Sequence, residues 1–279
     1  ARNGVVLQAN GNQTVIPKSD TPDITIPAQS HYSDDFSISG TANKTFQLVL
    51  DGDLSHSQTI KPDSNGKWQA QIDTQSMMDP KIQHSIVAWQ PETSTTSMPL
   101  NFTVEKKWQP ILVIDDPTGD DHGPTGTYQY PNDPGWRDNH PQDIERITIA
   151  TAGNNLKLSL KMHSITQLWN PSNGFDHVAF TAFIQLPNKV AGVRAMPLQN
   201  ANLPDDMQWH YRWRSHGWTN ALFSSDTASS NSEGTIQSAG VQINTHLESQ
   251  TIDVIFPSRA LGNLKSLSGL KLYINTWDY

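Results

Sequence analysis

The sequence predicts an all-β protein made of two β-sandwich domains. Three observations support this prediction. Apolar and polar residues alternate with a period of two in short segments rich in β-branched side chains, the pattern of half-buried strands. Clusters of Gly, Asn, Asp and Ser separate these segments and suit tight turns. No window of a dozen residues carries an apolar stripe of helical period, so an all-β class follows.

The predicted strands follow one another along the chain. They span residues 33–39, 45–50, 68–72, 85–89, 101–104, 144–149, 156–162, 178–184, 241–243, 251–256 and 271–276. The last of these alternates like a central strand and stops near the end of the sequence, so we expect more chain to follow in the parent protein.

A domain boundary is predicted near residues 106–110. At 279 residues the chain exceeds the usual size of one domain. The strands up to residue 104 have the spacing of a small sandwich, which we place at 27–106, and the others belong to a second domain at 108–279. Residues 1–26 are polar and contain Pro17 and Pro22. We interpret them as a linker or as the tail of a preceding domain.

Segments 36–42, 46–52 and 63–68 of the first domain resemble bacterial immunoglobulin-like repeats that are attached to secreted enzymes and adhesins. Asp51 and Gly52 suit one hairpin turn, and Asn65 and Gly66 suit another. Trp68 begins a strand and is expected to fill the core. These residues explain folding rather than chemistry.

Composition excludes several functional classes. The net charge is −8 and basic residues form no run, so the electrostatic footprint of nucleic-acid binding is missing. No apolar run reaches membrane-spanning length. The absence of cysteine excludes disulfides and thiolate sites, and the polar, weakly charged composition favours an exported protein.

The loop at 114–131 combines four carboxylates with turn-forming glycines in a segment that cannot be helical. Calcium takes six to eight oxygen ligands, which such a bend can supply. We expect Asp116, Asp120 and Asp121 to be ligands, whereas Asp115 points to the opposite side and has a structural role. The glycine and glutamate that an EF-hand requires are missing. The alternative is a solvated acidic turn whose aspartates cap backbone amides.

The same loop resembles the opening of the carboxy-terminal domain of bacterial glucodextranase and of related accessory domains on alpha-amylases and pullulanases. Further matches follow in order at 143–149, 169–175, Trp209, 217–218 and 252–261. The resemblance covers nearly all of 108–279. It implies a sandwich similar to family nine carbohydrate-binding modules and to the wider sugar- and haem-binding class, attached to an upstream catalytic domain that acts on alpha-glucans. It also implies that Asp143 joins the calcium ligands.

Aromatic residues provide the sugar-binding hypothesis. In a strand over 209–218, alternation places Trp209, Tyr211 and Trp213 on one face, where they form either a sugar platform or part of the core. Core packing is favoured for Trp209 and Trp218, whereas Tyr211 and Trp213 are preferred for function. The loop residues Trp136 and Trp169 are further exposed-aromatic candidates, with core lids as the alternative.

No catalytic constellation is recognisable. The acidic residues gather in one loop instead of facing each other across a cleft, and none of the familiar nucleophile, zinc or nucleotide motifs occurs. The histidines are interpreted as surface or hydrogen-bonded residues. Haem ligation by Met162, His163 and His210 remains an alternative.

Three functional hypotheses follow. The preferred one is a non-catalytic accessory region of a secreted amylase-type enzyme, which binds starch-like alpha-glucan and contains structural calcium. The second is a spacer that stabilises the catalytic domain without binding sugar. The third is an extracellular adhesion module.

Overall fold

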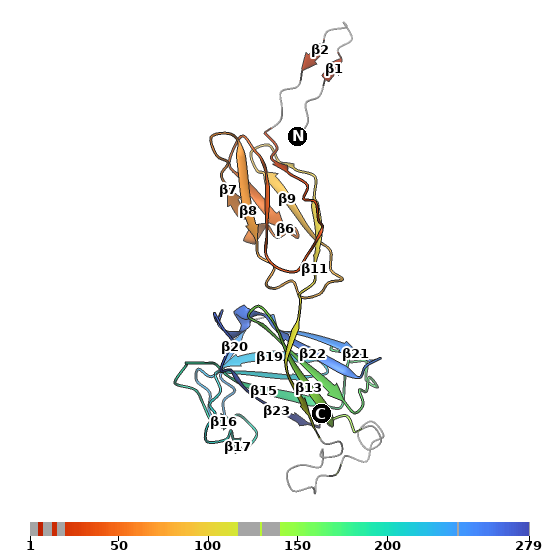
Figure 1. Cartoon of the computed structure of the whole chain (residues 1–279), viewed down its shortest axis with the longest axis vertical. Helices are drawn as coiled ribbons and strands as arrows, with labels where there is room; N and C mark the ends of the chain where they lie inside the picture. The colour runs from red at the N-terminus through yellow and green to blue at the C-terminus, as the bar shows by residue number, and fades with distance from the viewer. Residues whose placement is uncertain are drawn as a thin grey trace. The chain divides into compact units, whose positions relative to one another are not determined.

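The computed structural model describes residues 5–7, 13–15, 20–116, 129, 140–238 and 240–278. They form strands and two short 3-10 helices, with no α-helix in these ranges, which confirms the predicted all-β class. The chain divides into two compact units, Ala1–Lys107 and Trp108–Tyr279 (Figure 1). Within the stretch predicted as a linker, β1 (Val5–Leu7) and β2 (Gln13–Val15) pair antiparallel.

Besides the β1-β2 pair, the described residues of the first unit form two sheets. The smaller has the order β3-β5-β8, formed by β3 (Asp23–Ile24), β5 (Phe36–Thr41) and β8 (Lys67–Ile72). The larger has the order β4-β11-β9-β6-β7, with β10 beside β9; its strands are β4 (His31–Tyr32), β6 (Phe46–Leu50), β7 (Gln58–Ile60), β9 (His84–Gln90), β10 (Thr95–Thr96) and β11 (Leu100–Val104). Because β3 pairs with β5, the sandwich begins before residue 27.

Trp68 fills the core of the first unit, as expected. Its indole is buried, and its Nε1–H donates to the carbonyl of Asp23 over 3.1 Å. Gly40 allows this approach, since a Cβ there would lie 1.9 Å from the same carbonyl oxygen. The assignment of this unit to the immunoglobulin-like class stays a prediction.

The two predicted hairpin turns differ in outcome. Asp51 and Gly52 adopt positive φ at the start of the connection between β6 and β7, which pair with each other. Gly66 also adopts positive φ, but it precedes β8, and β8 pairs with β5 instead of with β7. The second hairpin prediction was therefore wrong, because turn chemistry specifies local backbone angles and not the strand that pairs.

The second unit is a sandwich of two five-stranded sheets. The first sheet has the order β12-β13-β14-β22-β21, formed by β12 (Gln109–Asp115), β13 (Ile144–Ala152), β14 (Asn155–Met162), β22 (Thr251–Phe256) and β21 (Gln242–His246). The second sheet has the order β20-β19-β18-β15-β23, formed by β20 (Thr235–Gln237), β19 (Thr219–Ser224), β18 (Tyr211–His216), β15 (Ala179–Gln185) and β23 (Lys271–Trp277). The structure places β23 last in its sheet, not at the predicted central position.

The main core of the second unit lies between these sheets. Leu158 and Val254 come from the first sheet, and Phe180 and Trp213 come from the second. A smaller cluster covers part of the outer face of the second sheet and includes Phe183, Met196 of β16 (Ala195–Met196) and Leu203, which follows β17 (Ala201–Asn202).

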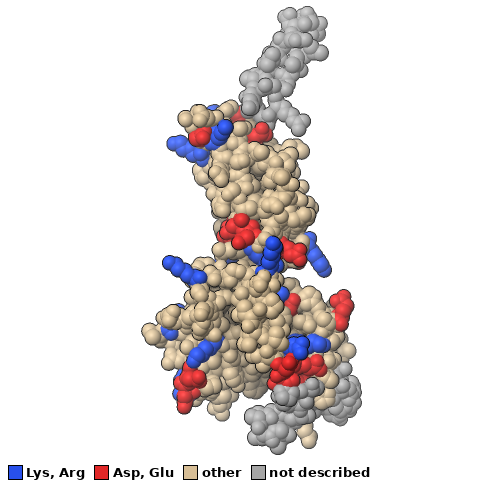
Figure 2. All heavy atoms as spheres, viewed as in Figure 1, with Lys and Arg blue, Asp and Glu red and all other residues tan. Residues whose placement is uncertain are grey.

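On the visible face, charged side chains of the described residues are scattered among uncharged ones and do not gather into a basic patch (Figure 2). None of the described segments forms a helix of the length and apolarity that crossing a bilayer requires.

Candidate functional site

Two tryptophans from different elements meet at the surface of the second unit. Trp169 lies in the loop 166–176, and Trp218 lies in the turn between β18 and β19. Their ring centroids are 6.3 Å apart, and their planes differ by 22°. Trp169 is 48% exposed and Trp218 is 42% exposed. We call these two residues the tryptophan platform, because nearly parallel exposed indoles offer apolar faces to a ligand.

Hydrogen bonds tie the loop to the hairpin beneath the platform. The side-chain amide of Asn173 donates to the carbonyls of His216, over 2.8 Å, and Thr219, over 2.9 Å. The backbone N–H of Asn173 donates to the carbonyl of Gly217 over 2.8 Å. From β21, the hydroxyl of Thr245 donates to the carbonyl of Asn173 over 2.7 Å. These bonds hold Trp169 and Trp218 in a fixed relation.

A buried carboxylate positions Trp169. Asp176 accepts hydrogen bonds from the hydroxyl of Thr166, over 2.5 Å, and from Nδ1 of His177, over 2.6 Å, both at Oδ1. Its second oxygen accepts from the backbone N–H of Trp169 over 2.6 Å. The ring of His177 lies 4.1 Å from the ring of Trp169, centroid to centroid. Because Asp176 and His177 are both buried, they form a rigid base for one tryptophan of the platform.

The aromatic face predicted on β18 is a core face. Trp213 is 0% exposed, stacks near Phe180, and donates from Nε1 to Asn220 over 2.8 Å. Its indole is therefore not available to a sugar, which corrects the expectation. Tyr211 is half-buried and packs against the same core, and burial raises the pKa of its phenol. The inward face of a sandwich strand takes the largest apolar side chains, and alternation alone does not show which face is inward.

Of the two tryptophans assigned to the core, one is buried and the other is exposed. Trp209 is fully buried, as the core interpretation expected, but it belongs to the smaller cluster with Phe183 and does not share a face with Trp213. Trp218 was also assigned to the core and is exposed instead. Its position after Gly217, at the tip of a two-stranded hairpin, is the signal that would have identified it as a surface residue.

The predicted calcium ligands are described only in part. Asp120, Asp121 and the candidate sugar-binding residue Trp136 lie outside the described residues. The backbone N–H of Asp116 donates to the carbonyl of Glu145 over 2.9 Å, which places Asp116 close in register to Asp143. Among the described residues, no three His, Asp or Glu side chains are arranged to hold a metal ion. Calcium stays a prediction.

A polar groove of about 670 Å³ lies next to these residues on the outer face of the first sheet. Charged side chains line it and pair with one another. Arg146 donates to Asp115 over 2.5 Å, and Nζ of Lys161 lies 4.0 Å from a carboxylate oxygen of Glu145. The pairing of Asp115 with Arg146 agrees with a structural role for this aspartate.

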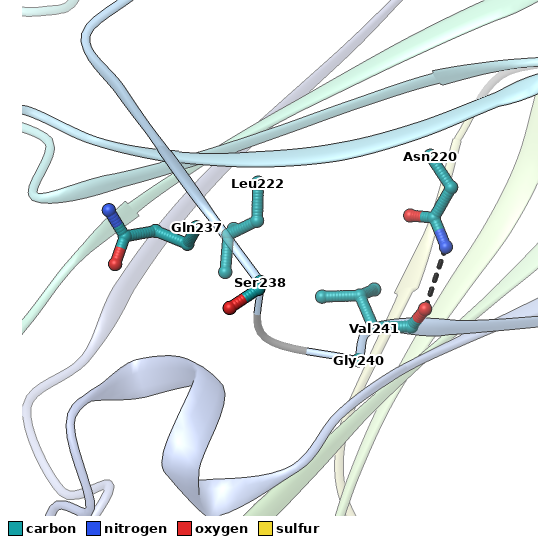
Figure 3. A pocket seen from close by; sticks show the side chains of 6 residues that line it. All are labelled: Asn220, Leu222, Gln237, Ser238, Gly240 and Val241. Atoms are coloured by element: carbon teal, nitrogen blue, oxygen red, sulfur yellow. Dashed lines mark hydrogen bonds between the residues drawn. The ribbon is translucent and has the colours of Figure 1, made fainter.

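A second hollow, of about 390 Å³, lies between β19 and the start of β21, and Figure 3 shows the side chains that line it. The side chains that line it include Asn220, Leu222 and Gln237. The amide of Asn220 donates to the carbonyl of Val241 over 2.6 Å and accepts from the indole of Trp213. Since no aromatic face lines this hollow among the described residues, it does not offer the stacking surface that the tryptophan platform does.

An arginine and glutamate network lies on the outer face of the second sheet. Arg214 donates from Nε to Glu233 over 2.6 Å, and Arg212 donates to the same oxygen over 3.2 Å. Burial alone raises the pKa of Glu233, but the hydrogen bonds and positive charges of the two arginines outweigh it and hold this pKa below its usual value. The guanidinium of Arg212 also lies 4.9 Å from the ring centroid of Phe223.

The residues of the haem alternative are engaged in the fold. Met162 is fully buried in the main core. Nδ1 of His210 accepts the backbone N–H of Leu186 over 2.9 Å, while His163 lies beside Glu145. The geometry therefore favours the tryptophan platform over haem ligation.

Comparison with known proteins gives one informative match. Residues 111–277 match the family model described as the C-terminal binding module, SLH-like, of glucodextranase. No curated protein matches the chain. A solved structure of the C-terminal domain of the Streptococcus agalactiae AgI/II polypeptide BspA aligns over 98% of this chain and 89% of its own at 11% identity, with a TM-score of 0.19, too low to support a conclusion. The family match covers more than half of the chain.

Proposed function

We propose a sugar-binding function from one premise: this chain belongs to the family of C-terminal binding modules of glucodextranase. In this proposal the second unit binds a starch-like alpha-glucan at Trp169 and Trp218. The whole chain serves as a non-catalytic accessory region of a secreted glycoside hydrolase whose catalytic domain lies elsewhere in the parent protein. The observation that carries the proposal is the exposed, nearly parallel pair of indoles.

The chemistry of the platform suits a pyranose. The C–H faces of a sugar ring are apolar and pack on indole rings, while its hydroxyls need hydrogen-bond partners at the rim. The side chains of Ser172 and His216 lie in the loop and hairpin that carry the platform and supply such partners. Surface exposure of both indoles before binding means that little rearrangement is needed.

The expected affinity of one platform is modest. Each aromatic contact contributes roughly 1 kcal/mol, so binding by the isolated region is weak. Attachment to a catalytic domain compensates for this, because tethering holds the enzyme near a polysaccharide that presents many identical sites. A weak, exposed site is therefore consistent with an accessory role.

Affinity electrophoresis of the whole chain in gels containing soluble starch tests the proposal. We expect starch to retard the wild-type chain, and Trp169→Ala and Trp218→Ala each to weaken retardation by about fivefold in the apparent dissociation constant. Tyr273→Ala, which removes another exposed ring of the same unit, serves as the matched control and should bind normally. Thermal melts establish that each variant is folded.

Two results would contradict the proposal. Wild-type protein that migrates identically with and without starch would favour the spacer hypothesis. Retardation that survives the loss of both platform tryptophans would place the sugar elsewhere on the molecule.

A further inference from the structure

We propose that Trp277 forms a second sugar subsite, so that a glucan held by the tryptophan platform continues across the outer face of the second sheet to β23. This inference rests on the proposed function, because it assumes that the platform binds sugar. It adds that the ligand is a chain of several residues and not a single terminal sugar. Trp277 is 43% exposed, which lies between the values of Trp218, 42%, and Trp169, 48%.

Strand alternation assigns Trp277 to the outer face. Leu272 and Ile274 of β23 pack against the main core, so the side chains of residues 273, 275 and 277 point the other way. The same reasoning applies to β18, where Trp213 is in the core and Arg214 and His216 are outside. Trp277 and His216 therefore lie on one face of one sheet.

The register brings Trp277 into line with the platform. Trp277 of β23 pairs with Ala179 of β15, and Phe180 of β15 pairs with Ser215 of β18. His216 therefore lies on the far side of Ala179, about 10 Å from β23, given strand spacings of about 4.8 Å. The ring of His216 is 6.2 Å from that of Trp218. Since the side chain of Ala179 is only a methyl group, no large side chain of β15 stands between Trp277 and His216 in this row.

A chain of amides supports Trp277. Its Nε1–H donates to Oδ1 of Asn275 over 3.3 Å, and the amide of Asn275 donates to Gln199 over 2.9 Å. Gln199 in turn donates to the hydroxyl of Thr181 over 3.1 Å. An exposed indole held by such a chain loses less conformational entropy on binding than a free one. Amide groups beside an exposed ring are also what sugar hydroxyls require.

The neighbouring row supplies polar groups on the other side. Thr181 pairs with Asn275 on one side and with Arg214 on the other. On this face of the sheet, Arg214 therefore lies in the row next to that of Trp277 and His216. Its guanidinium is fixed by Glu233. Burial, and then the positive charge of Arg214, lower the pKa of His216, which favours the neutral ring. Nδ1 of this ring accepts the backbone N–H of Trp218 over 3.3 Å, which ties His216 to the platform.

Chain-length dependence of binding tests this inference. Isothermal titration calorimetry of the whole chain would compare maltose with maltoheptaose. We expect Trp277→Ala to weaken maltoheptaose binding about fivefold and to change maltose binding by less than about twofold. Tyr273→Ala, on the same strand and face but four residues away, should leave both unchanged. Trp277→Phe should restore much of the loss, because phenylalanine retains a face for stacking.

The outcomes separate the two proposals. Normal maltoheptaose binding by Trp277→Ala, together with loss of binding by Trp169→Ala, would overturn the second subsite and leave the platform intact. Failure of wild-type protein to bind either sugar would overturn the proposed function and this inference with it. If Trp277→Ala does not fold, Trp277→Leu replaces it, and equal maltoheptaose affinities of Trp277→Leu and Trp277→Phe would overturn the subsite.

Discussion

At the scale of single residues, Asp176 determines how Trp169 is presented. Its carboxylate accepts from the hydroxyl of Thr166, from His177 and from the backbone of Trp169, all in a buried setting. Asparagine at position 176 would replace one carboxylate oxygen with an NH₂ group. This NH₂ group would face one of the three donors instead of accepting from it. Loss of a buried acceptor costs about 1–3 kcal/mol, and the loop that carries Trp169 would shift.

We therefore expect Asp176→Asn to lower the free energy of unfolding by about 2 kcal/mol and also to weaken starch retardation. Urea denaturation and affinity electrophoresis measure the two effects. Asp205→Asn is the control, since Asp205 pairs with Arg194 at the surface and its loss should change little. Unchanged stability in Asp176→Asn would show that the three hydrogen bonds are not as important as the geometry implies.

At the scale of elements, the hairpin of β18 and β19 carries Trp218, and Gly217 permits its contact with the loop 166–176. A Cβ on Gly217 would lie 2.6 Å from the carbonyl oxygen of Phe175 and 2.9 Å from Cβ of Pro171. Both distances are shorter than van der Waals contact. The hairpin and the loop can approach each other only with glycine at this position.

Gly217→Ala is expected to push the hairpin from the loop and to weaken sugar binding. Gly153→Ala is the matched control, because Gly153 lies in the turn between β13 and β14 and has open space at its Cβ position, although its φ of 59° makes alanine strained. Both variants should melt at lower temperature than wild type, but only Gly217→Ala should lose starch retardation. Equal sugar affinities of the two variants would mean that Trp218 needs no support from the loop.

At the scale of the whole molecule, the predicted calcium ion is expected to stabilise the folded chain. A ligand that binds only the folded state stabilises by mass action, by about 2.7 kcal/mol when it is present at 100 times its dissociation constant. We expect a chelator to lower the melting temperature of the whole chain, added calcium to restore it, and Asp120→Ala to remove this response. Identical melts with and without chelator would exclude a structural calcium ion and support the acidic-turn alternative.

Strand positions were largely predictable from the sequence, because they depend on local chemistry. The periods at 144–149, 156–162 and 251–256 correspond to β13, β14 and β22, and Gly153 makes the predicted turn between the first two. β12 was missed because four consecutive apolar residues, 111–114, do not alternate. All four side chains are exposed, in a strand that lies at the end of its sheet.

The sequence alone determined the all-β class and most of the strands, since these follow from alternation and turn residues. Only the tertiary structure decided which tryptophans are exposed. Trp213 is buried and Trp218 is exposed, although they lie five residues apart. The physical reason is that the sheet packed against a strand decides which face of that strand is buried. The tryptophan platform also needs contacts between the loop 166–176 and the β18–β19 hairpin, which are distant in sequence.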